Sequence, residues 1–184
     1  MIKTSMRFAA AFALVLAFLA LPGCSTNNQG DDAVPLYLTV DFTLLPAVKH
    51  VSDGSLLQFS TVTIKSVMKS PTAATSSMLD TRLDDYVIVW SRLDQGTKVP
   101  KTETFAGNVM IPVGGTSTLS NYPFMSISAL SLSPLDQLFP YNGGIDRETG
   151  SSEIRCAGTV TFRGHTMAGQ PVQGTGTFGM AFLY

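Results

Sequence analysis

Residues 154–184 read IRCAGTVTFRGHTMAGQPVQGTGTFGMAFLY, and this stretch decides the fold. Its apolar residues recur at every second position on both sides of the segment Met167–Pro171, which contains a glycine and a proline. Period-two alternation around such a segment predicts a β-hairpin with one buried face. The residues expected on that face are Ile154, Cys156, Gly158, Val160, Phe162, Val172, Phe178, Met180, Phe182 and Tyr184.

The rest of the chain repeats this pattern and shows no long helical period. Extended segments are expected at 34–44, 57–68, 86–90, 104–113, 116–119 and 124–132. Within 57–68 the apolar positions switch from odd to even, which predicts a bulge. Ser133 and Pro134 favour one helical turn at 134–138. Short strands joined by turns predict an all-β fold, an antiparallel β-sandwich of about 7–9 strands.

The N-terminus has the anatomy of a bacterial export signal. Lys3 and Arg7 precede the apolar run 8–21, and Leu21-Pro22-Gly23-Cys24 closes it. The run is shorter than the roughly 20 residues that a membrane-spanning helix needs. The closing four residues resemble the lipobox of bacterial lipoproteins, which implies that Cys24 is lipidated and becomes the first mature residue. An ordinary secretory signal with an incidental cysteine is the alternative.

This resemblance sets the expected organisation of the chain. Residues 1–23 are expected to be a lipoprotein signal peptide that forms a helix, 24–33 a flexible polar tether and 34–184 a β-sandwich domain. The expected anchor is the lipid bilayer, held through acylated Cys24. Ser25 follows the cysteine, where Asp would favour the inner membrane in enterobacterial sorting. The predicted location is therefore the cell envelope, at the outer membrane of a Gram-negative bacterium.

Charge limits the kinds of partner. The leader holds two of the 12 Lys and Arg residues and none of the 13 Asp and Glu residues, so the mature net charge is −3. A mildly acidic chain without a basic block is a poor nucleic-acid binder, and no nucleic-acid partner is predicted. Only 14% of the residues are charged, which suits an exported β protein.

Three phrases resemble bacterial immunoglobulin-like domains. They are Gly158-Thr-Val-Thr-Phe-Arg-Gly-His, Gly174-Thr-Gly-Thr-Phe-Gly-Met-Ala-Phe and Val109-Met-Ile-Pro-Val-Gly-Gly-Thr-Ser-Thr-Leu. The resemblance implies an immunoglobulin-like sandwich and supplies no catalytic residues. The Cys-Trp-Cys pattern of an antibody core is missing from the sequence. With Cys24 lipidated, Cys156 has no partner for an internal disulfide, so it is expected to be a buried small hydrophobe. An intermolecular disulfide or a cofactor attachment is the alternative.

Catalytic and metal motifs are weak. His50 and His165 stand outside any metal-binding spacing, and both are expected to be loop or strand-end residues. Asp80, Asp84 and Asp85 are expected in a turn. Two alternatives are weighed: a serine hydrolase using His165, and a calcium site in the loop 141–150. The calcium ligands would be Asn142, Asp146 and Glu148.

These observations predict a non-enzymatic structural or protein-interaction module of the cell envelope, without a metal or cofactor. Its partner would be an envelope protein, bound by loops at one end or by an exposed strand edge. The alternative class is a glycan or envelope-polysaccharide binding module. Trp90, which is expected to be buried, and Tyr86, Tyr122 and Tyr141 are its available aromatic platforms. Aromatic residues around the Ser-rich segment (Tyr122, Phe124, Phe139 and Tyr141) are expected to cap the open end of the sandwich or to line a recognition patch.

Overall fold

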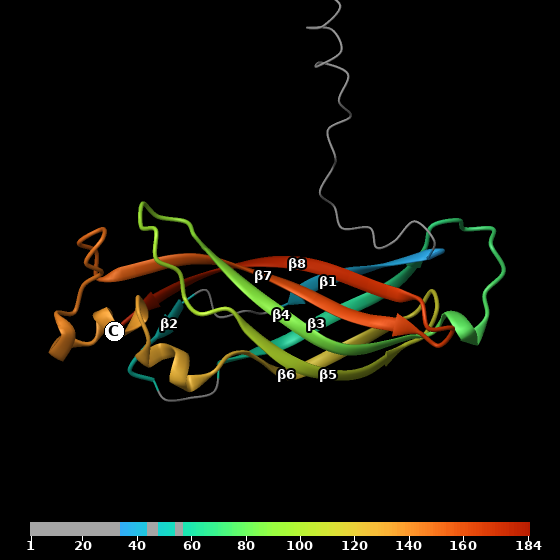
Figure 1. The fold of residues 1–184 in the computed structure, drawn as a ribbon, viewed down its shortest axis with the longest axis horizontal. Coiled ribbons are helices and arrows are strands. Elements are labelled where there is room, and N and C mark those ends of the chain that lie inside the picture. The colour runs from blue at the N-terminus through green and yellow to red at the C-terminus, as the bar shows by residue number, and fades with distance from the viewer. Residues whose placement is uncertain (1–33, 44–47, 54–56) are drawn as a thin grey trace, which may run out of the picture.

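The computed structural model describes residues 34–43, 48–53 and 57–184, and these form two β-sheets stacked face to face (Figure 1). The predicted signal helix 1–23, Cys24 and the tether 24–33 lie outside the described residues. Within the described part of the chain, no helix is long and apolar enough to cross a membrane. The all-β prediction is confirmed.

One sheet has three strands, ordered β1-β3-β6. Their bounds are β1 Leu36–Thr43, β3 Leu57–Met68 and β6 Thr116–Met125. The other sheet has five strands, ordered β2-β8-β7-β4-β5. Their bounds are β2 Val48–His50, β8 Pro171–Leu183, β7 Glu153–Thr166, β4 Thr81–Arg92 and β5 Glu103–Ile111.

Eight strands among the described residues fall within the predicted range of 7–9. Every neighbouring pair is antiparallel, as predicted, except that β2 runs parallel to β8. The parallel pair accompanies a change of sheet: β1 and β2 are close in sequence but belong to different sheets. The first strand pairs with β3, and the chain then crosses to the edge of the larger sheet.

The predicted C-terminal hairpin is confirmed as β7–β8, with pairing that runs from Glu153 opposite Leu183 to His165 opposite Pro171. Alternate residues of β7 from Ile154 to Phe162 are buried, as are Val172, Phe178, Met180 and Phe182 of β8. Tyr184, expected on the same face, is instead exposed beyond the strand end. The sequence pattern therefore assigned the inner face correctly over the paired length.

The predicted switch of inward positions in β3 is also present. The buried apolar residues of this strand are Leu57, Phe59, Val62 and Ile64. The switch lies where Asn121 of β6, between the paired residues Ser120 and Tyr122, adopts a φ of 60°. A residue in this left-handed conformation interrupts the regular pleat, and Asn tolerates it better than most residues. The register shift between β3 and β6 lies nearer the start of β3, between Leu57 and Gln58.

Aromatic rings join the two sheets. The ring of Phe178 on β8 lies 5.3 Å from that of Phe59 on β3, in an edge-on arrangement. It also contacts Phe42 of β1 at 5.5 Å and Phe124 of β6 at 5.8 Å. Trp90 of β4 approaches Phe178 edge-on at 5.5 Å. Every strand of the smaller sheet therefore places a ring against Phe178, and such pairs stabilise a core beyond simple burial.

Two glycines of β8 let the sheets approach closely. A Cβ atom at Gly174 would lie 2.6 Å from Leu38 Cβ and 3.1 Å from the Leu38 carbonyl oxygen. A Cβ atom at Gly176 would lie 2.6 Å from the ring of Phe42. Because only hydrogen occupies these positions, β1 can pack directly over β8.

The predicted strand 124–132 is wrong beyond Met125, where β6 ends. Glu103 of β5 accepts hydrogen bonds from both the backbone N–H and the hydroxyl of Ser126, at 2.8 and 2.5 Å, so this residue is taken out of the sheet ladder. Short 3₁₀ helices follow: η2 Ile127–Ser131, η3 Leu135–Leu138 and η4 Pro140–Asn142. The helical turn predicted at 134–138 is present as η3, but Pro134 rather than Ser133 occupies its N-cap position.

The sandwich has two ends with different contents (Figure 1). The Val34 end, where β1 begins, carries the turns 112–115 and 167–170 and the connection 69–80, which contains η1 Ser77–Leu79. The opposite end, called here the Tyr184 end, carries the C-terminus and the longer connections 93–102 and 126–152. The register pairs Leu36–Met68 and Leu57–Met125 set this division.

The close approach at Gly174 can be tested against Gly179, another glycine of the same strand. Gly174→Ala is expected to lower the free energy of unfolding by about 1–3 kcal/mol, because the new methyl group overlaps Leu38. Gly179→Ala has its nearest neighbour at 3.9 Å and is expected to be neutral or slightly stabilising. Urea unfolding of the two variants measures the difference. Equal effects would contradict the proposed packing constraint.

Candidate interaction site

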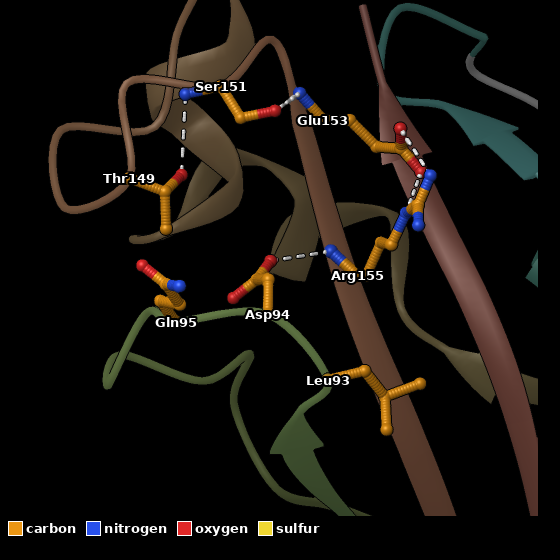
Figure 2. Close-up of a pocket in the computed structure, with 7 residues that line it drawn as sticks. All are labelled: Leu93, Asp94, Gln95, Thr149, Ser151, Glu153 and Arg155. Carbon is orange, nitrogen blue, oxygen red and sulfur yellow. Dashed lines mark hydrogen bonds and ion pairs between the residues drawn. The ribbon is translucent and has the colours of Figure 1, made fainter.

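An open cleft of about 550 Å³ lies at the Tyr184 end (Figure 2). Its walls come from three segments that are distant in the sequence: the connection after β4, the loop 143–152 and the first residues of β7. The lining residues are Leu93, Asp94, Gln95, Thr149, Ser151, Glu153 and Arg155. The cleft is therefore built by the loop end of the sandwich rather than by one strand or turn.

Arg92, the last residue of β4, connects the segments that form the cleft through hydrogen bonds of its side chain. Its side chain is 3% exposed, and its Nε donates to Asp94 Oδ1 at 2.6 Å. Its Nη2 donates to Asp146 Oδ2 at 2.7 Å, and Asp146 is fully buried. Nη1 donates to the carbonyl oxygen of Lys98 at 2.9 Å. A buried guanidinium requires this degree of pairing, because an isolated buried charge is very costly.

The Arg92 contacts are reflected in the pKa values of the network. Burial alone raises the pKa of Asp94, but hydrogen bonds from Arg92 and from the backbone N–H groups of Arg155 and Gly96 outweigh it and lower the pKa to about 2. Burial likewise opposes ionisation of Asp146, yet hydrogen bonds from Arg92 and Thr149 lower its pKa. Both carboxylates are therefore ionised near neutral pH, and they neutralise the buried cation.

Asp94 also connects the turn after β4 to β7. Its Oδ1 accepts the Gly96 N–H at 3.0 Å, which closes a tight turn after β4. Its Oδ2 accepts the Arg155 N–H at 2.9 Å (Figure 2). One carboxylate thus fixes the turn both internally and to the neighbouring strand.

Glu148 fastens the loop 143–152 to the connection 93–102. One oxygen accepts the N–H groups of Thr97 and Lys98 at 2.7 and 2.8 Å, and the other accepts the Thr97 hydroxyl at 2.7 Å. The Lys98 backbone hydrogen bond is the main cause of the lowered pKa of Glu148, followed by the bonds from Thr97. The two loops therefore form one preorganised unit.

The side chains considered as calcium ligands make hydrogen bonds within the protein. The acidic oxygens of Asp146 and Glu148 are occupied by different protein donors, and the Asn142 side chain donates to the carbonyl oxygen of Asp136 at 2.9 Å. Among the described residues, no group of three or more His, Cys, Asp or Glu residues is arranged to hold a metal ion.

The cleft presents polar groups and one apolar side chain to solvent. Arg155 is exposed and donates to Glu153 at 2.7 Å, while Gln95 and Ser151 add hydrogen-bonding groups (Figure 2). Leu93 is exposed at the rim. The cleft therefore combines a charged pair, amide and hydroxyl groups and an exposed leucine. Protein recognition surfaces have this mixed polar and apolar character.

Three aromatic rings lie at the same end. Tyr141 is 78% exposed, and its ring stacks on that of Phe139 with 5.2 Å between centroids. Tyr184 approaches Phe139 edge-on at 6.1 Å, and its backbone carbonyl lies 2.7 Å from His50 Nδ1. Large exposed aromatics of this kind are typical anchors of binding surfaces.

The remaining aromatic candidates are not platforms. Trp90 is buried, as predicted, and so are Tyr86 and Phe124. Tyr86 donates its hydroxyl to the Pro123 carbonyl at 2.7 Å, and burial raises its pKa. Tyr122 is half-buried beside Tyr86. Of the four residues considered for glycan stacking, Tyr141 alone is freely exposed.

The two histidines lie on different strands of the larger sheet. His50, expected in a loop, ends strand β2, whereas His165 lies near the end of β7, as predicted. His165 Nδ1 lies 2.8 Å from Asp84 Oδ2. Within the part of the chain that the structure describes, the hydrogen bonds of this imidazole ring do not include a serine hydroxyl, which a serine hydrolase triad would require.

The turn predicted for Asp80, Asp84 and Asp85 is wrong for two of them. Asp84 and Asp85 lie inside β4, where the register shifts between Leu83 and Asp85 and leaves both carboxylates off the buried face. Asp85 pairs with Arg163 at 2.7 Å. Asp80 precedes β4 and accepts the Val113 N–H at 2.9 Å.

Cys156 is fully buried and free, as expected for a small hydrophobe. Burial raises the pKa of its thiol to about 12, so little thiolate forms near neutral pH.

Sequence reasoning missed Arg92, although a signal was present. Arg92 shares the inward parity of Tyr86, Ile88 and Trp90 along β4. A cation at a buried strand position predicts carboxylate partners, and Asp94 stands two residues away. The second partner, Asp146, could be found only from the tertiary structure.

No family of proteins matches this chain, and neither a curated protein nor a solved structure matches it.

Removing the buried counterion of Arg92 is expected to destabilise the protein. Asp146→Ala leaves a 3% exposed guanidinium short of one partner and should lower the free energy of unfolding by about 3 kcal/mol. Glu153→Gln breaks an exposed pair and should cost less than about 1 kcal/mol. Urea unfolding compares them. Equal losses would show that Arg92 does not organise these loops.

Acid should remove the contribution of Asp94. Its folded pKa of about 2 lies below the unfolded value of roughly 3.9, so it stabilises the fold above about pH 4 and this stabilisation is lost as the pH falls toward 2. Asp94→Asn should therefore destabilise the protein at pH 7 and have little effect at pH 2. Unfolding free energies of both proteins at several pH values measure this. A difference independent of pH would contradict it.

Proposed function

We propose that this chain is an envelope lipoprotein, acylated at Cys24, whose immunoglobulin-like domain binds an envelope protein at the Tyr184 end. The observation that carries the proposal is the preorganised loop surface there. Buried ion pairs and backbone hydrogen bonds hold two loops in place, while Leu93 and Tyr141 project from the surface they form. Binding to a surface held in shape beforehand loses little conformational entropy.

The strand order supports an immunoglobulin-like topology. In immunoglobulin domains, strands A, B and E share one sheet, and strands C, F and G share the other. If β1 and β2 are the two parts of strand A, then β3, β4, β6, β7 and β8 correspond to B, C, E, F and G, and β5 extends the sheet beside C. The connections of the Tyr184 end, which follow strands C and E, then form one cluster at the end opposite the B–C and F–G loops.

The distribution of exposed apolar side chains favours this end. The Tyr184 end holds eight of the twelve large hydrophobic residues that are exposed in the described part of the chain. They are Val48, Leu93, Val99, Ile127, Leu132, Tyr141, Ile145 and Tyr184. Such a concentration beside polar, hydrogen-bonding groups is expected of a protein interface.

A strand edge is a weaker candidate. β5 forms one edge of the larger sheet. However, its pairing with β4 shifts register between Leu83 and Asp85, and an interrupted edge resists the addition of another strand. The other edge strand of this sheet, β2, has three residues. We therefore place the partner on the loops.

The lipobox, the polar segment after it and Ser25 support anchoring at the outer membrane of a Gram-negative bacterium. Several acyl chains on one residue hold a protein at a bilayer far more firmly than one chain does. A module anchored in this way works beside membrane neighbours at a high effective concentration, so a modest interface suffices.

Crosslinking in living cells tests the proposal. A tagged full-length chain is expected to capture one dominant envelope protein. The double variant Leu93→Ser, Tyr141→Ser should reduce that capture at least fivefold, because it removes the two apolar contacts projecting from the loops. Val89→Ser, which changes an exposed residue in the middle of β4, is the matched control and should leave capture unchanged. Quantitative mass spectrometry of the captured protein gives the readout.

Two comparisons separate the parts of the proposal. Mass analysis of the membrane-bound protein shows whether Cys24 carries acyl chains, and Cys24→Ser should release the chain from the membrane. Capture that is equal in the loop variant and the control would overturn the loop interface. Recovery of the domain alone, with glycan binding that is lost in Tyr141→Ser, would favour the glycan-binding alternative, for which the exposed Tyr141 ring is the platform.

A further inference from the structure

Three exposed methionines gather at the Val34 end, away from the loop surface. Met78, Met110 and Met167 are 54%, 47% and 51% exposed, although methionine is usually a core residue. The other methionines of the described residues lie in or against the core. The three exposed ones come from three separate connections or strands: η1, β5 and the turn after β7.

Hydrogen bonds bring these segments together. The Met167 N–H donates to the Asp80 carbonyl at 2.9 Å, and the Ala168 N–H donates to the Met78 carbonyl at 2.9 Å. Met110 is paired with Arg82 of β4, which in turn is paired with His165 of β7. The methionine side chains therefore belong to one end of the domain rather than to scattered positions.

The expected lipid anchor is attached to this same end. Leu36 pairs with Met68, the last residue of β3, and the Lys69 N–H donates to the Pro35 carbonyl at 2.8 Å. From Cys24 to Val34 there are ten residue steps, which span at most about 36 Å when fully extended. A flexible chain of this length has an average reach of roughly 17 Å. The methionines are thus kept within a short distance of the membrane surface.

We propose that the Val34 end rests on the bilayer interface, with Met78, Met110 and Met167 in contact with lipid. The inference rests on the proposed acylation of Cys24. Flexible, polarisable methionine side chains adapt to an irregular apolar surface, and removing them from water favours contact. Lys65 and Arg82 are exposed near this end and suit anionic headgroups, whereas Asp84 and Asp85 are paired with His165 and Arg163.

This placement orients the domain. The strands run between the two ends, so contact of the Val34 end with lipid directs the Tyr184 end away from the membrane (Figure 1). The loop surface is then presented to a partner at the length of the sandwich from the bilayer. Membrane contact at one end and partner binding at the other are compatible.

Site-specific labelling tests the inference in the acylated full-length protein. Cys24 is consumed by acylation and Cys156 is buried, so a single introduced cysteine is the labelled site. Gln170→Cys places an environment-sensitive NBD label at the last residue of the turn 167–170 and leaves all three methionines intact. Leu132→Cys, at an exposed position of the Tyr184 end, is the matched control. Each protein is reconstituted into phosphatidylethanolamine–phosphatidylglycerol vesicles, with or without a nitroxide-labelled lipid.

The label at Gln170 is expected to be quenched by the nitroxide lipid at least twofold more than the label at Leu132. Adding Met78→Ser and Met167→Ser to the Gln170→Cys protein should remove most of that excess. Equal quenching at both ends, or an excess that survives the serine substitutions, would overturn the inference. A blue-shifted label that the nitroxide lipid does not quench would also overturn it, because a second protein copy would then cover this end.

Vesicle flotation separates this inference from the proposed function. Protein that floats with the vesicles but shows equal quenching retains its anchor and refutes the membrane contact alone. Protein that does not float and lacks acyl chains by mass analysis refutes both proposals.

Discussion

The contact of Phe178 with rings from every strand of the smaller sheet is the interaction on which this sandwich depends. Phe42, Phe59 and Phe124 reach it from β1, β3 and β6, and Trp90 reaches it from within its own sheet. The sheets can meet there because β8 carries glycine at two facing positions. β8 therefore contributes both a large ring, that of Phe178, and glycines without side chains, and the close packing of the two sheets requires both.

A different kind of force shapes the Tyr184 end. The apolar core stops near the end of β4, and Arg92 occupies the next inward position. Its charge is tolerated because Asp94 and Asp146 approach it from two loops, and those carboxylates in turn bind backbone N–H groups. An unpaired buried guanidinium would be costly, so the two loops are held in the one arrangement that pairs it. Such preorganisation makes this end suitable for recognition.

The two ends of the domain differ in chemistry as well as in loop length. One end combines rigid loops, exposed aromatic rings and a polar cleft, whereas the other carries short turns and exposed methionines. The lipid anchor proposed at Cys24 would give this asymmetry a direction, with one end toward lipid and the other toward a partner.

The sequence by itself determined the all-β class, the C-terminal hairpin with its buried face and the burial of Trp90 and Cys156. These follow from period-two alternation and turn residues, which act over a few positions. Only the tertiary structure decided the end of β6 at Met125, the parallel pairing of β2 with β8 and the union of Arg92 with Asp146. Each of these depends on residues far apart in the chain, such as Glu103 binding Ser126, and local patterns contain no information about which distant segments will meet.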